Sequence, residues 1–286
     1  MSEPYPGIRQ AISLLLVTAL LSAVCSLPIA MLGTVVGIPL MAHPLALAVA
    51  NLVAIGLVLK WGLGKVGASF FQVYPLTPVA QPLHLPMGFT IIGVGILLSE
   101  LDNLLRLALP VPASFASQLV DLMTGDSSLL GSLFLAVVVA PVTEELLFRG
   151  LILQGFLRRY SPRKAILASA LLFAAFHGNP WQFFGALVLG ILFAWWFVQT
   201  RSLIPCILGH ALNNAVPLVL IGVLDVEIEG FTSDPTVLEF QPAWLNLIGL
   251  LCAGWGLSRL VQAFSGRGGD AEAGPGTTEL PEDSRR

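Results

Sequence analysis

The sequence predicts an all-α polytopic membrane protein, a bundle of about eight transmembrane helices. The first observation is composition: 286 residues have a mean hydropathy of +0.84, with 56% apolar and 11% charged residues. Soluble proteins usually carry roughly 25% charged residues, and a globule of this size cannot bury so much apolar surface. The second observation is a series of long apolar segments, and the third is the uneven distribution of Lys and Arg between them.

The apolar segments are long enough, or nearly so, to cross a hydrocarbon core of about 30 Å. In chain order they are Ala11–Leu32, Pro44–Trp61, Gly88–Leu109, Leu129–Leu147, Ala165–His177, Phe183–Gln199, Ile204–Leu224 and Ala243–Ala263. Helices are expected because every backbone amide must be hydrogen-bonded within the lipid, and the alternation typical of barrel strands is absent from the sequence. The fifth segment is short, so we expect it to be tilted or covered by its neighbours.

Lys and Arg gather in alternate connections, which predicts that both termini are cytoplasmic, in a plasma or inner membrane. These cations are Arg9, Lys60, Lys65, Arg158, Arg159, Arg163, Lys164, Arg201, Arg259 and Arg267. The opposite connections carry the carboxylates of Asp121, Asp126, Asp225, Glu227, Glu229, Asp234 and Glu239. Of the cations in the sequence, Arg106 alone is expected near that side.

The chain is expected to have four parts: about three transmembrane helices in 1–128, a core in 129–218, an outer loop and last transmembrane helix in 219–264, and a polar, disordered cytoplasmic tail in 265–286. A net charge of −3 without a basic stripe excludes nucleic acid as a partner. The three cysteines lie in apolar stretches at no ligand spacing, so neither a disulfide framework nor a Cys-based zinc site is indicated.

Placing a charged side chain in the hydrocarbon core costs free energy, so charged residues within the apolar segments indicate a structural or functional role. The fourth segment ends in Thr143-Glu144-Glu145, followed by Arg149. Glu145 and Arg149 are four residues apart and share a helix face, so they can pair. Glu144 points about 100° away from Glu145. An ion pair at the membrane edge explains Glu145 and Arg149 but leaves Glu144 free to face another helix.

Two histidines supply possible partners for Glu144. His177 ends the fifth segment, and His210 lies within the seventh, where Asn214 shares its face and Asn213 does not. Each histidine alone is typical of a hydrogen-bonded helix residue, whereas the set indicates a site. A carboxylate in a low-dielectric environment is an effective general base, and imidazole and amide groups can stabilise an oxyanion. Zinc is the alternative chemistry, because Glu and two His are a known ligand set, but the H-E-x-x-H motif is absent.

At these residues the sequence resembles the CPBP family of intramembrane proteases, which includes the type II CAAX prenyl endopeptidases and the Abi, bacteriocin-processing and lysostaphin-resistance-like proteins. The resemblance covers roughly Leu129–Leu218, about a third of the chain. Its three motifs occur in order. They are E-E-x-x-x-R at Glu144, Glu145 and Arg149, F-x-x-x-H at Phe173 and His177, and H-x-x-x-N at His210 and Asn214.

The resemblance implies an eight-helix bundle with a water-filled cavity and an endopeptidase activity on a membrane-anchored substrate, including prenylated CAAX-type proteins. It implies that Glu144 and His177 activate water and that His210 and Asn214 form the oxyanion hole. Glu145 and Arg149 would then be supporting groups. We expect no cofactor to be required. If zinc is bound instead, its ligands are Glu144, His177 and His210.

Two other functions remain open from the sequence. A catalytically silent membrane scaffold would keep the family fold and bind a partner, and an ion transporter would use the buried glutamates. A second polar group, in the third segment, is compatible with a structural cluster near the outer interface or with part of a substrate path. It consists of Glu100, Asp102, Asn103 and Arg106.

Overall fold

The computed structural model describes residues 4–38, 40–117, 128–233 and 237–269, which form helices and no strands. The predicted all-α class is therefore confirmed. The long helices are α1 (Ile8–Val36), α2 (Pro44–Val66), α4 (His84–Ala108), α9 (Pro162–Phe176), α10 (Pro180–Thr200), α11 (Ile204–Gly222) and α12 (Ala243–Gly269). Shorter pieces are α3 (Phe70–Val73), 3-10 turns at Leu40–Ala42 and Gln81–Leu83, and a helical stretch at 113–117.

The fourth transmembrane segment is one continuous helix, Leu129–Leu157, with two wide turns. It consists of α6 (Leu129–Leu133), a π-helical stretch Phe134–Val139, α7 (Ala140–Glu145), a second π-helical stretch Leu146–Leu153, and α8 (Gln154–Leu157). π-Helical turns are rare and often lie at functional sites. Here they flank the two adjacent glutamates on both sides.

Proline and glycine set most helix boundaries. Pro44, Pro162 and Pro180 occupy the first turns of α2, α9 and α10, where a missing N–H costs nothing. Gly37 and Gly67 follow α1 and α2 with φ of 71° and 66°. That left-handed backbone closes a helix and favours glycine.

In the described residues, seven helices are long and apolar enough to cross a membrane, where about eight were expected. The segment that falls short is the fifth, Ala165–His177, which corresponds to α9. α9 has 15 residues and is therefore about 22 Å long, less than the roughly 30 Å of a hydrocarbon core. It packs against α10 and the second π-helical stretch, in keeping with the expectation that its neighbours cover it.

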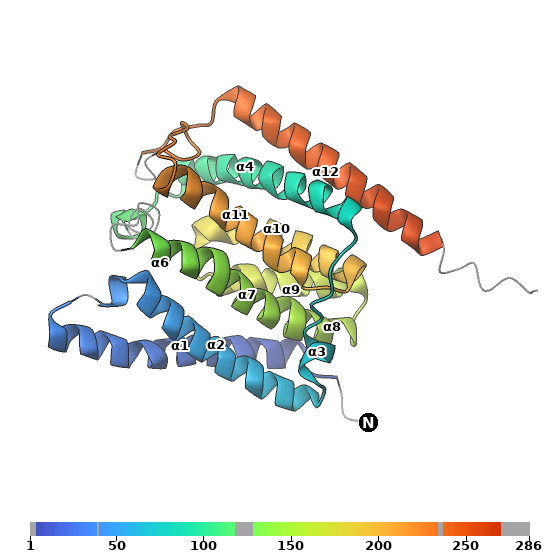
Figure 1. Ribbon diagram of the computed structural model, residues 1–286, viewed down its shortest axis with the longest axis horizontal. Helices are drawn as coiled ribbons and strands as arrows, with labels where there is room; N and C mark the ends of the chain where they lie inside the picture. The colour runs from blue at the N-terminus through green and yellow to red at the C-terminus, as the bar shows by residue number, and fades with distance from the viewer. Residues whose placement is uncertain (1–3, 39, 118–127, 234–236, 270–286) are drawn as a thin grey trace, which may run out of the picture.

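The beginning of α1 and the end of α12 lie at the same end of the bundle (Figure 1). The connections between α2 and α3, α8 and α9, and α10 and α11 lie at that end too. We call it the basic end, because its described cations are Arg9, Lys60, Lys65, Arg158, Arg159, Arg163, Lys164, Arg201 and Arg259. We call the other the open end. It contains Arg106, Asp225, Glu227, Glu229 and Glu239, whereas Asp121, Asp126 and Asp234 lie outside the described residues.

The last helix is longer than expected, since α12 continues to Gly269. Residues 265–269, assigned above to the tail, are therefore helical. Residues 270–286 lie outside the described part of the chain.

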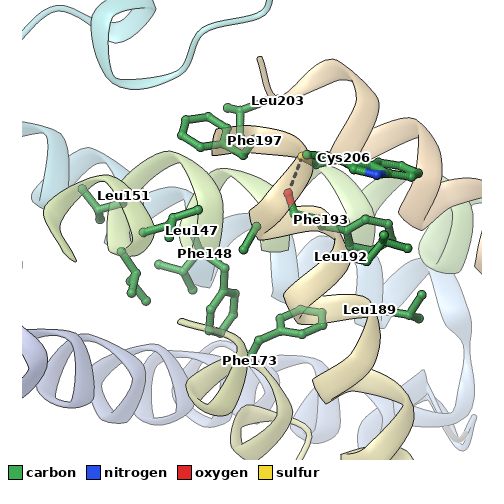
Figure 2. Packing of buried hydrophobic residues seen from close by; sticks show 14 of the residues in the cluster. Leu147, Phe148, Leu151, Phe173, Leu189, Leu192, Phe193, Phe197, Leu203 and Cys206 are labelled. Atoms are coloured by element: carbon green, nitrogen blue, oxygen red, sulfur yellow. Dashed lines mark hydrogen bonds between the residues drawn. The ribbon is translucent and has the colours of Figure 1, made fainter. Parts of the chain in front are cut away.

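A dry apolar core fills the basic end of the bundle (Figure 2). Its members come from the end of the fourth segment, the second half of α10 and the beginning of α11. Leu147, Phe148, Leu151, Phe156, Phe193, Trp196, Phe197, Leu203 and Cys206 are all at most 1% exposed. This core holds in place the helices that carry the polar residues described next.

Candidate active site

Three of the predicted polar residues form one buried network. Glu145 Oε1 accepts hydrogen bonds from Arg149 at 3.0 Å and from His210 Nδ1 at 2.9 Å. Glu145 and Arg149 are 0% exposed, and His210 is 6% exposed. Because a carboxylate accepts, the His210 hydrogen lies on Nδ1, and Nε2 is left for another partner. The predicted pairing of Glu145 with Arg149 is confirmed, and the network ties α7 to α11.

Arg149 is further held by a carbonyl and two rings. Its second guanidinium nitrogen donates to the Gly190 carbonyl at 3.1 Å, and its guanidinium carbon lies 4.5 Å from the Phe173 ring centroid and 5.4 Å from that of Phe193. The Phe193 ring also stacks on His210, with centroids 5.7 Å apart and an interplanar angle of 22°. These contacts hold the side chains of Arg149 and His210 in place, and none of them involves a further charged group.

His177 is the C-terminal cap of α9, and a hydrogen bond fixes the orientation of its ring. Its Nδ1 lies 2.9 Å from the Phe173 carbonyl oxygen. A carbonyl can only accept, so the hydrogen lies on Nδ1 and the lone pair on Nε2. No hydrogen bond from a described residue reaches Nε2. His177 therefore presents a basic nitrogen to whatever occupies the adjacent space.

Helix register displaces Glu144 and His177 to the same side of one contact between two aromatic rings. The rings of Phe148 and Phe173 are in contact, with centroids 5.0 Å apart (Figure 2). Glu144 is one turn before Phe148, and His177 is one turn after Phe173 on the neighbouring antiparallel helix. Both residues are therefore displaced by one turn toward the open end. Oε2 of Glu144 is buried without a hydrogen-bond partner in the described structure, a state that calls for an explanation in a native protein.

Asn214 compensates for a proline in the fourth segment. In the first π-helical stretch Ala140 N donates to the Leu135 carbonyl, so the residue after it should donate to the Ala136 carbonyl. That residue is Pro141, which has no N–H. Asn214 Nδ2 donates to the Ala136 carbonyl instead, at 2.9 Å. Its other amide hydrogen remains available.

A cavity of about 380 Å³ brings several of these residues together. His177, His210 and Asn214 line it, with Phe173 and Phe193 between them. Glu144, Glu145 and Arg149 do not line it. Glu145 is bonded to His210, which does, and Arg149 lies over the Phe173 and Phe193 rings, which also do. The cavity also has walls from α4, α10 and the connection between α11 and α12, including Gly95, Ser99, Asp102, Asn103, Arg106, Trp181, Gly185, Phe231 and Glu239.

The arrangement does not match the zinc site that the sequence left open. Within the described residues, no group of three or more His, Cys, Asp or Glu side chains is placed to hold a metal ion. Glu144 is absent from the cavity lining that the two histidines share. We therefore derive no chemical step through a metal.

The polar group of the third segment has two parts. Glu100 is structural: its carboxylate accepts from Asn103 at 3.1 Å and from the backbone of Gln241 at 3.0 Å, and Asn103 also donates to the Gly230 carbonyl at 2.7 Å. These bonds hold the connection before α12 against α4. Asp102 and Arg106 form an ion pair of 2.7 Å and line the cavity.

Several residues of the site were not identified from the sequence. Asn213, expected to face elsewhere, also lines the cavity and donates to Asn214 Oδ1 at 3.2 Å. Phe193 and Gly190 support His210 and Arg149, but they lie in an apolar helix where nothing in the sequence distinguishes them. Pro141 was a usable signal, because a proline inside a helix leaves a carbonyl unpaired.

Residues 126–216 match the model of a protein family described as type II CAAX prenyl endopeptidase, Rce1-like. This segment resembles that family. The match confirms the family resemblance predicted from the three motifs, and it contains all of them. No curated protein and no solved structure matched the chain. The Rce1-like match supports a CAAX-type intramembrane protease in general. With the candidate spans, it identifies an integral, multi-pass membrane protein.

Proposed function

We propose that the protein is an intramembrane endopeptidase that hydrolyses a peptide bond of a membrane-associated substrate, using water activated by Glu144 and His177. The observation that carries this proposal is the pair of unsatisfied groups at the open end of the Phe148–Phe173 contact. One is the buried Oε2 of Glu144, and the other is Nε2 of His177. A proton-accepting carboxylate beside a proton-accepting imidazole is suited to orienting and deprotonating water.

The other polar groups of the site support a complete hydrolysis. Water adds to the scissile carbonyl while Glu144 takes its proton, and a tetrahedral oxyanion forms. His210 and Asn214 are the donors for that oxyanion. His210 can donate from Nε2 only as an imidazolium, because Nδ1 already donates to Glu145, and the Glu145 carboxylate stabilises that charge. The proton held by Glu144 then passes to the leaving amine, which breaks the C–N bond.

The orientation in the membrane belongs to the same proposal. Membrane proteins keep Lys and Arg in their cytoplasmic connections, so the basic end faces the cytoplasm, and both termini lie there, in a plasma or inner membrane. The substrate is a membrane-anchored peptide or protein, with prenylated CAAX-type tails as one candidate named by the family. No cofactor is assigned.

The test compares membranes from cells that carry the wild type, Glu144→Gln, or no protein, with mass spectrometry of new peptide termini. Loss of a general base lowers the rate by roughly 10²–10⁴-fold, so we expect termini that require the wild type and disappear in Glu144→Gln. Glu227→Gln, an exposed glutamate at the open end, is the matched control and keeps the cleavage. Full cleavage by a folded Glu144→Gln variant would refute the proposal.

A further inference from the structure

We infer that the substrate peptide reaches the active site from the non-cytoplasmic side of the membrane, so the protein acts on peptide segments exposed at that surface. This inference rests on the proposed function for the hydrolysis and on the proposed orientation of the bundle. Three features of the structure carry it: the closed basic end, the direction of the cavity and the composition of its mouth.

The basic end is closed directly behind the site. Cys206 lies one turn from His210 toward Arg201, is 0% exposed and donates to the Phe193 carbonyl at 3.2 Å. Trp196, Phe197 and Leu203 continue this wall, each at most 1% exposed. Figure 2 shows Phe197 and Leu203 beside Cys206. Close-packed side chains of this kind leave no passage for a polypeptide.

The cavity runs from the site in the opposite direction. Its lining on α11 extends from His210 to Ile221, eleven residues or about 16 Å of helix. Its lining on α4 extends from Ile91 to Arg106, and on α10 from Phe193 back to Trp181. In each helix the lining begins near the middle and ends at the open end. His210 therefore lies at the bottom of a cavity that is approached from the open end, and His177 lies on its wall.

The mouth of the cavity lies where a membrane-tethered peptide would pass. Trp181 Nε1 donates to the Leu109 carbonyl at 2.9 Å, and the Trp181 and Phe115 ring centroids are 5.1 Å apart. Tryptophan with an apolar body and a bonded polar tip is typical of the membrane–water interface. Val237 and Glu239, from the connection before α12, complete the rim.

These features determine on which side of the membrane the substrate must lie. With the cationic connections in the cytoplasm, the mouth opens at the opposite interface. The scissile bond must then belong to a peptide on the non-cytoplasmic side, either released there or tethered to that leaflet. A tail displayed only in the cytoplasm, including the prenylated tail of a cytoplasmic protein, meets the packed wall.

The side of the mouth can be measured without any substrate. In the full chain, Cys25 and Cys252 are replaced by Ala, and the fully buried Cys206 is kept. A single cysteine is then introduced at Val237, exposed at the mouth, or at Ser161, exposed at the basic end. With a membrane-impermeant maleimide, we expect Val237→Cys to label in intact cells and Ser161→Cys only after permeabilisation. The reverse pattern, or equal labelling of both in intact cells, overturns the inference.

The route is tested with a cysteine on the cavity wall. Gly185 lines the cavity, and a Cβ added there meets nothing within 4 Å. A Cβ at Gly254, on the lipid-facing side of α12, is equally unobstructed. We expect the impermeant maleimide to label Gly185→Cys and abolish its cleavage, while Gly254→Cys keeps it. Absent labelling, or labelling with full cleavage, overturns the route.

The experiments distinguish a failure of the proposed function from a failure of this inference. Labelling of Val237→Cys and Ser161→Cys does not require activity, so a protein that cleaves nothing would disprove the proposed function and leave the side of the mouth determined. A protease that labels at Val237 only after permeabilisation would keep the proposed function and lose this inference.

Discussion

The two ends of the helix bundle differ in how their interiors are filled. At the basic end, side chains from the end of the fourth segment, the second half of α10 and the beginning of α11 pack together, and Phe148, Phe156, Trp196 and Leu203 are all 0% exposed. At the open end, α4, α9, α10 and α11 surround a cavity of about 380 Å³ with histidine and asparagine side chains on its walls. The polar network of Glu145, Arg149 and His210 lies where the two regions meet.

Because of this difference, the packed basic end stabilises the fold, whereas the open end carries the groups proposed for catalysis. In lipid, helices associate through close packing and interhelical hydrogen bonds, because lipid tails are as apolar as leucine. The basic end supplies the packing. The network at the boundary supplies hydrogen bonds from the fourth segment to α10 and α11. The open end can therefore keep a polar group such as Nε2 of His177 facing the cavity, where a substrate or water can bind to it. Variants on the two sides should separate activity from stability.

The largest expected effect is at the open end, with Asn214→Ala. Removal of one oxyanion donor lowers the turnover rate by roughly 10²–10³-fold. The same change leaves the Ala136 carbonyl unpaired, which lowers the free energy of unfolding by about 1–3 kcal/mol. Cleavage rate and thermal unfolding in detergent measure the two losses separately.

A second substitution distinguishes the two roles of Asn214. Pro141→Ala restores an N–H that can donate to the Ala136 carbonyl in the π-helical register. The double variant Pro141→Ala, Asn214→Ala should regain the stability of the wild type and remain inactive. Recovery of both properties together would show that Asn214 acts only as a structural partner of the fourth segment.

A smaller effect, on stability alone, is expected at the basic end. Phe156→Ala leaves a void beside Tyr160, whose ring centroid is 5.8 Å away. We expect a loss of about 3 kcal/mol in the free energy of unfolding, the lower end of the usual range, because lipid rather than water surrounds much of the bundle. Phe184→Ala is the control, since Phe184 is 46% exposed and lipid can replace its ring. Cleavage per folded molecule should be unchanged in both, and a selective loss of activity in Phe156→Ala would break the separation.

Much of the fold was predictable from the sequence because its boundaries are local. Pro44, Pro162 and Pro180 begin helices and Gly37 and Gly67 end them, and the long apolar runs between such residues require helices in lipid. The shortness of α9 was also predictable, because its apolar segment in the sequence is short. The π-helical stretches were not, because they depend on which carbonyl each amide reaches after folding.

The site was predictable only as a set of residue types. The i, i+4 spacing correctly paired Glu145 with Arg149, and the bond from His210 to Glu145 joins residues that are 65 positions apart. A contact between residues so far apart in the sequence cannot be derived from helix periodicity. The face assigned to Asn213 was wrong, since the cavity is wide enough to be lined by both asparagines. The catalytic roles of Glu144 and His177 stay predictions.

The smallest expected effect concerns a single hydroxyl at the basic end. Tyr74, in the connection after α3, is 1% exposed, packs against Gly150 and has no hydrogen-bond partner for its hydroxyl among the described residues. Burial raises the pKa of Tyr74 to about 12, above its ordinary value of about 10. The folded state therefore favours the neutral phenol, and this stability is complete below pH 10 and lost as the pH rises through 12. Tyr74→Phe should be at least as stable as the wild type near neutrality, because it removes a buried unpaired hydroxyl, and its advantage should grow between pH 10 and 12, as measured by thermal unfolding across that range. Parallel curves for the two proteins would mean that the hydroxyl reaches water and that the packing at the basic end is looser than the structure shows.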